Sequence, residues 1–430
     1  MAYTITPPQY LGDKDFVNFF KSWTPETWLA RQTSDIVADL SSVEFMAPWA
    51  VVLYTNYLLW LKEVRQNRLE VKLGDSSRSS VYAIQSGIPS ILGFQPGFSA
   101  ESQSKDRMSP LTRIQTSDDV PKFAQTVMRL LNVGDEELEG ALRYSIIELP
   151  RNVVQHSKSR PGGLAMAQYY PKTGLVEVAV ADVGIGVLQA LKPKYPEVDT
   201  DLKALRLSIL PHVSGTFSSG AYGSMSDNAG LGLFFIKEIA TRSSGGFFFG
   251  SGSAMMDLWG NEDGTLGKQY LSSHGEWPGT FAMLQLRRDA IAEFDSLLGV
   301  CRELAAAVTK DPSTLSLDFS DRPPFQGSAL ILKVIEFDEN VQRAADIREK
   351  QVIPQLAANK EVAWDFTGVR AATQSFVHAC MYRVLRDCPN ARTLMTICGC
   401  TKATKEAIKT VAAYAALGAK QLKDAPPQKE

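Results

Sequence analysis

One stretch of the chain spaces a carboxylate, an amide and an imidazole four residues apart, at Glu148, Asn152 and His156. In a helix, positions four apart share a face, so these side chains would project together. A side-chain amide oxygen is an acceptable ligand for Mg²⁺, and a carboxylate can act as a general base. The pattern therefore suits a magnesium phosphate site, although an amphipathic helix with a wet polar face would share it.

Pro150 lies between the carboxylate and the amide of this stretch. Proline removes a backbone hydrogen bond and is expected to bend the helix between Glu148 and Asn152. We expect His156 to pack or hydrogen-bond beside the site rather than to act chemically.

Two glycine-containing segments follow. The strand-like run 175–180 ends just before Asp182, which is followed by Gly184 and Gly186, a pattern that an ordinary turn at a strand end also shows. Further on, Gly230-Leu231-Gly232-Leu233 precedes a predicted helix at 233–241. The free amides at such a helix start suit phosphate oxygens.

With Gly279-Thr280-Phe281 at a predicted strand start, these segments resemble in order and spacing the GHKL superfamily of ATP-binding domains. Histidine kinases, anti-sigma factor kinases, DNA gyrase and mismatch-repair ATPases share this domain. The resemblance implies ATP and Mg²⁺ as ligands. It implies that Asn152 binds Mg²⁺, that Glu148 is the general base, that Asp182 accepts a hydrogen bond from the adenine amino group beside Gly184, Gly186 and Thr280, and that Gly230, Leu231, Gly232 and Leu233 face the phosphates. The stretch from Gly186 to Asn228 is the expected ATP lid.

The fold class that we expect is α/β (α+β), with a central two-layer Bergerat-type ATP-binding sandwich, helices on one face of a mainly antiparallel sheet, flanked by two small STAS-like α/β domains. The predicted boundaries are 1–100 for the first STAS-like domain, 101–119 for a linker, 120–288 for the ATP-binding domain, 289–424 for the second STAS-like domain and 425–430 for a tail.

The two outer domains share a weak repeat. Asp39-Leu40-Ser41-Ser42-Val43 leads into the first helix of the N-terminal unit, and Asp365-Phe366-Thr367-Gly368-Val369 does the same in the C-terminal unit. Both resemble the strand-to-helix junction of STAS domains. STAS partners of anti-sigma factor kinases are phosphorylated near the next helix start, which here corresponds to Ser375. Ser375 is thus either a phosphoacceptor or a helix N-cap, and we favour the N-cap because Ser is a preferred capping residue.

Composition excludes several classes of protein. The chain of 430 residues is 44% hydrophobic, as expected for a folded protein. Its net charge is -2 and its acidic and basic residues are interleaved, so it has no overall positive electrostatic field that would attract nucleic acid. The five cysteines have no metal-ligand spacing. The apolar stretch 46–61 is too short and too polar to span a bilayer, and it predicts a buried helix. Without a predicted signal peptide or membrane span, we expect a cytoplasmic protein.

Three functions fit these expectations. The first is an ATP-dependent signalling switch with slow Mg²⁺-dependent hydrolysis. The second is a serine protein kinase of the anti-sigma factor type that uses Glu148 as its base. The third is a scaffold that binds ATP without turnover. Each allows a STAS-like or other regulatory protein partner, and the family resemblance also allows a homodimer.

Overall fold

The computed structural model describes most of the chain, which divides into two compact units. The first unit comprises residues 1–133, 148–210 and 233–294, and the second comprises 134–147, 211–232 and 295–430. The described residues are 2–21, 35–74, 78–95, 107–132, 136–193, 195–210, 213, 232–242, 244–260, 266–287, 317–320, 330–388 and 390–423.

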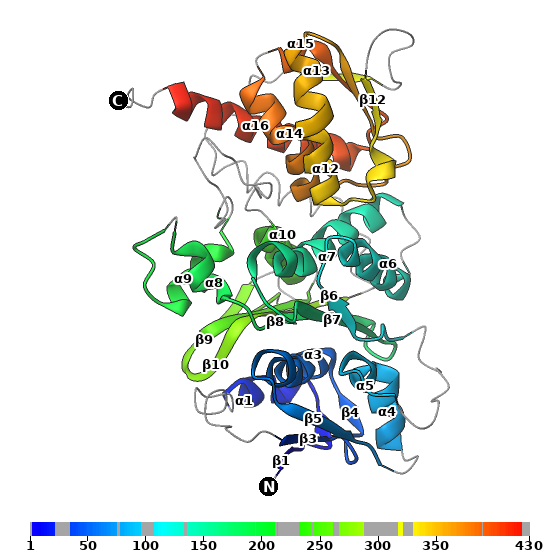
Figure 1. The fold of residues 1–430 in the computed structure, drawn as a ribbon, viewed down its shortest axis with the longest axis vertical. Helices are drawn as coiled ribbons and strands as arrows, with labels where there is room; N and C mark the ends of the chain where they lie inside the picture. Colours follow the sequence, from blue (N-terminus) through cyan, green and yellow to red (C-terminus); the bar gives the residue numbers. More distant parts are fainter. Residues whose placement is uncertain are drawn as a thin grey trace. The chain divides into compact units, whose positions relative to one another are not determined.

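A five-stranded antiparallel sheet forms the centre of the first unit (Figure 1). Its spatial order is β6-β7-β8-β10-β9, and every neighbouring pair is antiparallel. The strands are β6 (Thr112–Ile114), β7 (Gly163–Tyr170), β8 (Leu175–Asp182), β9 (Gly246–Gly260) and β10 (Leu266–Arg287). Strands β7 and β8 form a hairpin, since Tyr170 pairs with Leu175 across the turn at 171–174.

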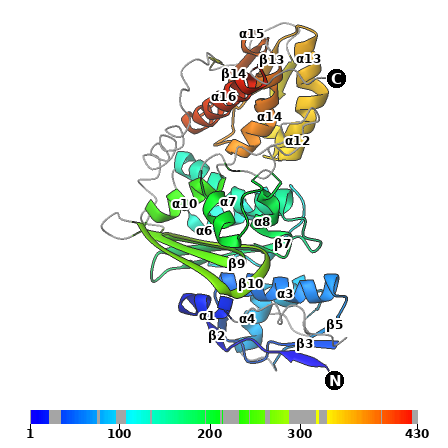
Figure 2. The same cartoon turned by 90° about the vertical axis from the view of Figure 1, so that its left-hand side faces the viewer.

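Four helices lie on one side of this sheet in both ribbon views (Figures 1 and 2). They are α6 (Asp119–Leu131), α7 (Glu136–His156), α8 (Gly186–Leu191) and α10 (Gly232–Arg242). The long helix α7 continues through Pro150, which is buried. A further helix, α9 (Asp201–Ser208), packs against β9.

The opposite side of the sheet is also covered, by helices from residues 1–100, which the sequence analysis assigned to a separate domain. Helix α3 (Pro48–Leu59) packs on β7 and β8, and α1 (Phe16–Lys21) packs on β10. Residues of these helices share one core with the small residues Ala179 and Ala181 of β8. The reason is in the strand itself, because a nearly continuous apolar run carries hydrophobic side chains on both faces and both must be buried.

The N-terminal part adds two small parallel sheets to the first unit. One has the order β1-β3-β5 and the other pairs β2 with β4. The bounds are β1 (Tyr3–Ile5), β2 (Tyr10–Leu11), β3 (Asp35–Asp39), β4 (Phe45–Met46) and β5 (Arg68–Lys72), with a 3-10 turn η1 (Asp13–Asp15), a π-helical turn η2 (Trp60–Val64) and helices α4 (Arg78–Ser86) and α5 (Ile88–Ile91). All twelve residues of α3 are buried, as predicted for the apolar stretch 46–61.

The predicted linker at 101–119 contains part of the central sheet. Strand β6 pairs with β7, and Met108 forms an isolated bridge with Gln168. Because β6 has only three residues between proline- and serine-rich neighbours, periodicity could not reveal it.

The second unit contains a parallel four-stranded sheet with the order β11-β14-β13-β12. The strands are β11 (Asp318–Ser320), β12 (Leu330–Lys333), β13 (Val362–Asp365) and β14 (Met395–Cys398). The helical segments are η4 (Val334–Phe337), α12 (Val341–Ile347), η5 (Arg348–Val352), α13 (Ile353–Ala357), α14 (Gln374–Asp387), α15 (Ala391–Leu394) and α16 (Lys402–Lys423). An α/β domain was predicted here, and the mixed α/β class is confirmed.

The sequence repeat has the same hydrogen-bond pattern in both units. Asp39 Oδ1 accepts the N–H of Ser41 at 3.0 Å, and Asp365 Oδ1 accepts the N–H of Thr367 at 3.0 Å. Each following residue donates to the end of a neighbouring strand: Leu40 to the carbonyl of Lys72 and Phe366 to that of Cys398. Both junctions are Asp turns that close a parallel strand.

The two junctions differ in how the next helix is capped. Thr373 caps α14, with its Oγ1 accepting the N–H of Phe376 at 3.2 Å. Ala47 is at the N-cap position of α3 and its side chain forms no capping hydrogen bond. The Trp49 N–H instead donates to Oε1 of Glu177 on β8 at 3.3 Å. A buried carboxylate of the central sheet therefore accepts one of the free N–H groups at the N-terminus of α3.

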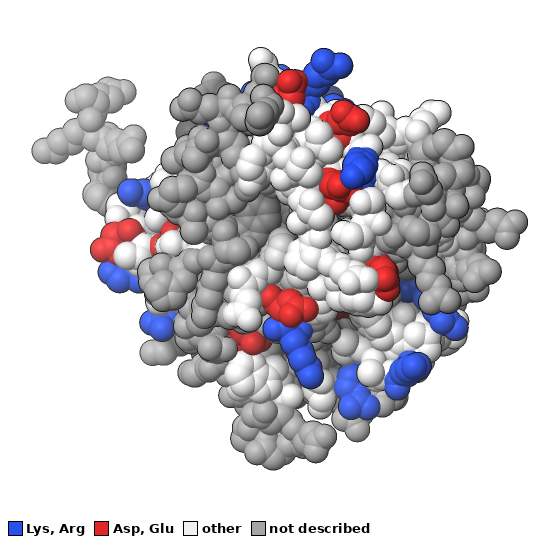
Figure 3. Space-filling view, turned by 90° about the horizontal axis from the view of Figure 1, so that it is seen from below, with Lys and Arg blue, Asp and Glu red and all other residues white. Residues whose placement is uncertain are grey.

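Among the described residues, no helix combines the length and apolar character that crossing a bilayer requires. In the view of Figure 3, basic and acidic side chains are interspersed among uncharged ones.

Candidate functional site

Asp182 ends β8 with its carboxyl group inside the protein. Oδ1 accepts the N–H of Gly184 at 2.8 Å, and the N–H of Thr280 on β10 also donates to this carboxylate. Burial nevertheless raises the pKa of Asp182 to about 7, because desolvation of the charge outweighs these two hydrogen bonds. Near neutral pH the carboxyl group can therefore exist in either protonation state. Such a raised pKa is unusual for an Asp side chain and is typical of functional sites.

Gly184 is pressed against the end of helix α7. A Cβ at this position would collide with the carbonyl oxygen of Ser157. The same carbonyl accepts the N–H of Ile185 at 2.8 Å. Only glycine allows this approach, so the loop after Asp182 is fixed to the residue that follows α7.

Gly279 touches Asp182 from the other side. A Cβ at Gly279 would overlap the backbone carbonyl oxygen of Asp182 and lie 2.5 Å from Oδ1 of the Asp182 side chain. The indole N–H of Trp277, a fully buried side chain, donates to the Asp182 carbonyl at 2.7 Å. Strand β10 thus surrounds Asp182 with backbone and with one indole.

Gly186 starts α8 in the left-handed region, with φ of 71°. A Cβ there would lie 2.7 Å from Oγ of Ser251, which is buried. The Ser251 hydroxyl donates to the Gly279 carbonyl at 2.7 Å and accepts the N–H of Val187 at 2.9 Å. Ser251 therefore joins β9, β10 and α8 into one support beneath the Asp182 loop.

Asn152 lies close to the same end of the sheet, because the next residue of α7, Val153, packs against the strand beside Asp182. Gly163 pairs directly with Asp182, and a Cβ on Gly163 would lie 2.6 Å from Cγ1 of Val153. The turn of α7 that carries Asn152 therefore rests on the strand beside Asp182. The Asn152 side chain is half-buried and has no hydrogen-bond partner in the described part of the chain, which leaves its amide oxygen available to a ligand.

Glu148 is held by an arginine that the sequence analysis did not single out. Arg151 Nη1 lies 2.7 Å from Glu148 Oε1, and the two side chains are only 4% and 3% exposed. Their spacing of three residues on a helix could have predicted this ion pair. The guanidinium fixes the orientation of the candidate base.

His156 lies at the C-terminal end of α7. Burial lowers the pKa of His156 to about 4, so the imidazole is neutral at physiological pH. A neutral, partly buried imidazole fits the expectation that it packs beside the site.

The phosphate-binding segment is only partly described. Gly230 and Leu231 lie outside the described residues, as do residues 211–212 and 214–228 of the expected lid. The earlier part of that stretch is described and contains helices α8 and α9. Gly232 is the first residue of α10 and Leu233 the second, which agrees with the predicted helix start near 233.

Ser375 is not the cap of α14, so the N-cap prediction is wrong. Thr373 caps the helix, and Ser375 is the second helical residue, only 5% exposed. Thr-Gln-Ser offers two candidate caps two residues apart, and sequence alone chose the wrong one. A kinase could reach the Ser375 hydroxyl only if the start of α14 opened.

The structure thus brings Asp182, Gly184, Gly186 and Thr280 together and places Asn152 on the adjoining turn of α7. Sequence reasoning missed four supporting residues: Arg151, Ser157, Ser251 and Trp277. In the described part of the chain, no cluster of three or more His, Cys, Asp or Glu side chains could hold a metal ion. A magnesium ion here would therefore need phosphate oxygens beside the Asn152 amide.

No protein-family model matches this chain, and no curated protein matches it significantly.

Proposed function

We propose that the protein binds ATP at the Asp182 end of the central sheet and works as a nucleotide-dependent signalling switch with slow Mg²⁺-dependent hydrolysis. The observation that carries this proposal is the enclosed Asp182 carboxyl group, with glycines at 184 and 279 packed against neighbouring backbone and carboxyl atoms. A buried carboxylate that lacks a cation is costly unless a ligand supplies a donor. An adenine amino group is such a donor.

The residues on α7 fit the polyphosphate end of the same ligand. Asn152 would hold Mg²⁺ through its amide oxygen together with phosphate oxygens, and the ion would offset the phosphate charge. Glu148, oriented by Arg151, would accept a proton from the attacking water. The buried Ser375 hydroxyl disfavours phosphorylation of this chain at that serine, so a kinase of the anti-sigma factor type would have to act on a separate partner.

Phosphate release measured with γ-labelled ATP tests the catalytic half of the proposal. The wild type should release phosphate slowly, Glu148→Gln should bind ATP without releasing phosphate, and Asn152→Ala should lose the Mg²⁺-dependent part of binding. A control on the same helix is Gln155→Glu, which changes neither the proposed base Glu148 nor the proposed Mg²⁺ ligand Asn152. If Glu148→Gln released phosphate at the wild-type rate, the assigned base would be wrong. If no variant or wild type released phosphate but ATP still bound, the scaffold function would replace the switch.

A further inference from the structure

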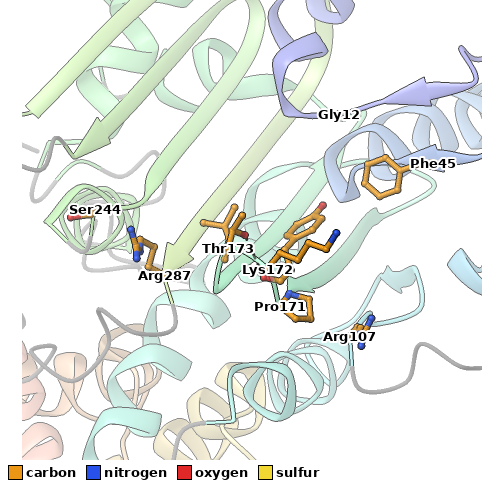
Figure 4. A pocket seen from close by; sticks show the side chains of 10 residues that line it. Gly12, Phe45, Arg107, Pro171, Lys172, Thr173, Ser244 and Arg287 are labelled. Carbon is orange, nitrogen blue, oxygen red and sulfur yellow. Dashed lines mark hydrogen bonds between the residues drawn. The ribbon is translucent and has the colours of Figure 1, made fainter.

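A pocket lies beside the β7–β8 turn, at the end of the central sheet opposite to Asp182 (Figure 4). Its volume is about 820 Å³, within the range of small-molecule sites. The lining residues all belong to the first unit and come from six separate segments: Gly12, Phe45, Arg107, Tyr170, Pro171, Lys172, Thr173, Leu175, Ser244 and Arg287.

Three of these residues form a row across neighbouring strands. Leu175 pairs with Tyr170 on β7 and with Arg287 on β10. Directly opposed residues of antiparallel strands present their side chains on the same face, about 5 Å apart. An aromatic ring, an aliphatic side chain and a guanidinium are therefore set side by side on rigid strands.

Arg107 is fixed to the same corner by backbone bonds. Its carbonyl accepts the N–H of Tyr169 at 2.7 Å, and the next residue, Met108, bridges to Gln168. The turn that carries Lys172 is closed by the N–H of Thr173 donating to the Tyr170 carbonyl at 3.2 Å. Two of the basic residues of the pocket are thus anchored by the hairpin itself.

The charge of the described lining residues has one sign. They include three cations, Arg107, Lys172 and Arg287, and no carboxylate. Within the described part of the chain, Arg107 and Lys172 have no ion-pair partner. Two described acidic residues close in sequence to the lining are engaged elsewhere: Glu44 accepts Nε2 of Gln9 at 2.5 Å, and Glu177 accepts the N–H of Trp49. The pocket therefore favours an anion.

The rest of the lining is largely apolar, with the rings of Phe45 and Tyr170 beside Pro171 and Leu175. We propose that this pocket binds a small phosphate-bearing molecule with a planar ring, the phosphate held by Arg107, Lys172 and Arg287 and the ring packed against Phe45 or Tyr170. The site is separate from the proposed ATP site. It lies at the start of β8, whereas Asp182 is seven residues further on, roughly 23 Å at the rise of a strand.

Isothermal titration of the full chain with phenyl phosphate, inorganic phosphate and benzyl alcohol tests this proposal. Phenyl phosphate should bind at one site and more tightly than either fragment, because it alone carries both the ring and the phosphate. The double variant Arg107→Ala/Lys172→Ala should bind it at least about tenfold more weakly, given the strength of charge-assisted hydrogen bonds. Both residues are exposed, so the variant should keep the wild-type melting temperature.

The matched control is Lys333→Ala/Lys360→Ala, which removes the same charge from exposed positions of the second unit. It should retain wild-type affinity for phenyl phosphate, and so should Asp182→Asn. Equal losses in both double variants would overturn the proposal by showing that net charge alone attracts the probe. A wild type that bound no phenyl phosphate would also overturn it, and a loss in Asp182→Asn would show that the probe occupies the ATP site instead.

Discussion

The backbone N–H of Gly184 donates a 2.8 Å hydrogen bond to Oδ1 of Asp182, two residues earlier in the chain. This short loop turns the carboxyl group back over the end of β8, where Gly279 and Trp277 enclose it. The resulting desolvation raises the pKa of Asp182 to about 7. Several consequences of this enclosure can be measured.

Asp182 should make the free protein less stable as pH rises. The folded carboxyl group keeps its proton up to pH about 7, whereas the unfolded one releases it near 3.8. The folded state thus binds more protons between these values, so this group lowers the free energy of unfolding by about 1.4 kcal/mol per pH unit across the window. Denaturant unfolding at pH 5 and pH 8 should show Asp182→Asn gaining stability relative to wild type at the higher pH.

The control for this measurement is Asp257→Asn. Burial also raises the pKa of Asp257, to about 6. The loss of stability that Asp257 causes with rising pH should therefore end about one pH unit lower than the loss caused by Asp182. A difference between Asp182→Asn and wild type that did not change with pH would contradict the assigned pKa.

Gly184→Ala should destabilise the Asp182 loop. The new Cβ would collide with the Ser157 carbonyl, which belongs to the backbone and cannot rotate away. We expect a loss of about 1–3 kcal/mol in the free energy of unfolding, together with weaker ATP binding. Gly12→Ala is the matched control because the nearest atom to its Cβ would be 4.0 Å away. Equal stability of the two variants would mean that the loop tolerates a side chain.

Arg151→Met should cost about 3–5 kcal/mol of stability, because it leaves the buried Glu148 carboxylate without its cation. The double variant Glu148→Leu/Arg151→Met should lose less, since it removes the charge as well as its partner. Chemical denaturation of both variants measures the difference. If the double variant lost as much stability as Arg151→Met, the unpaired Glu148 charge would not be the reason for the cost.

Glu177→Gln should weaken the attachment of α3 to the central sheet. The carboxylate accepts the Trp49 N–H at the helix N-terminus, where a negative charge is favourable. A loss of about 1–2 kcal/mol in the free energy of unfolding is expected. The exposed Glu70 on β5 provides the control, as Glu70→Gln should leave stability unchanged. A Glu177→Gln protein as stable as wild type would show that the amide caps the helix equally well.

Most strands and helices could be predicted because their hydrophobic patterns are long and regular. The run 175–180 and the helix beginning at Pro48 are examples. Strand β6 could not, since three residues carry no period. The covering of both sheet faces was readable in the apolar run of β8 but was not inferred.

Within the candidate site, the residues that could be selected from the sequence were those with a distinctive pattern, such as Asp182 and the glycines that follow it. The supporting contacts of Ser251 and Trp277 depend on register between distant strands, which no local pattern encodes. The cap of α14 was misassigned because Thr373 and Ser375 are equally good capping residues, and only the backbone angles decide between them.

Titration of the full chain with ATP and Mg²⁺ at pH 7.5, wild type beside Asp182→Asn and Asp257→Asn, tests the central claim most directly. Both variants exchange a carboxyl group of raised pKa for an amide, but only Asp182 is placed to accept the adenine amino group. We predict that the wild type and Asp257→Asn bind ATP with the same affinity and that Asp182→Asn binds at least about tenfold more weakly. Equal ATP affinity in all three proteins, or no ATP binding by the wild type, would contradict the account.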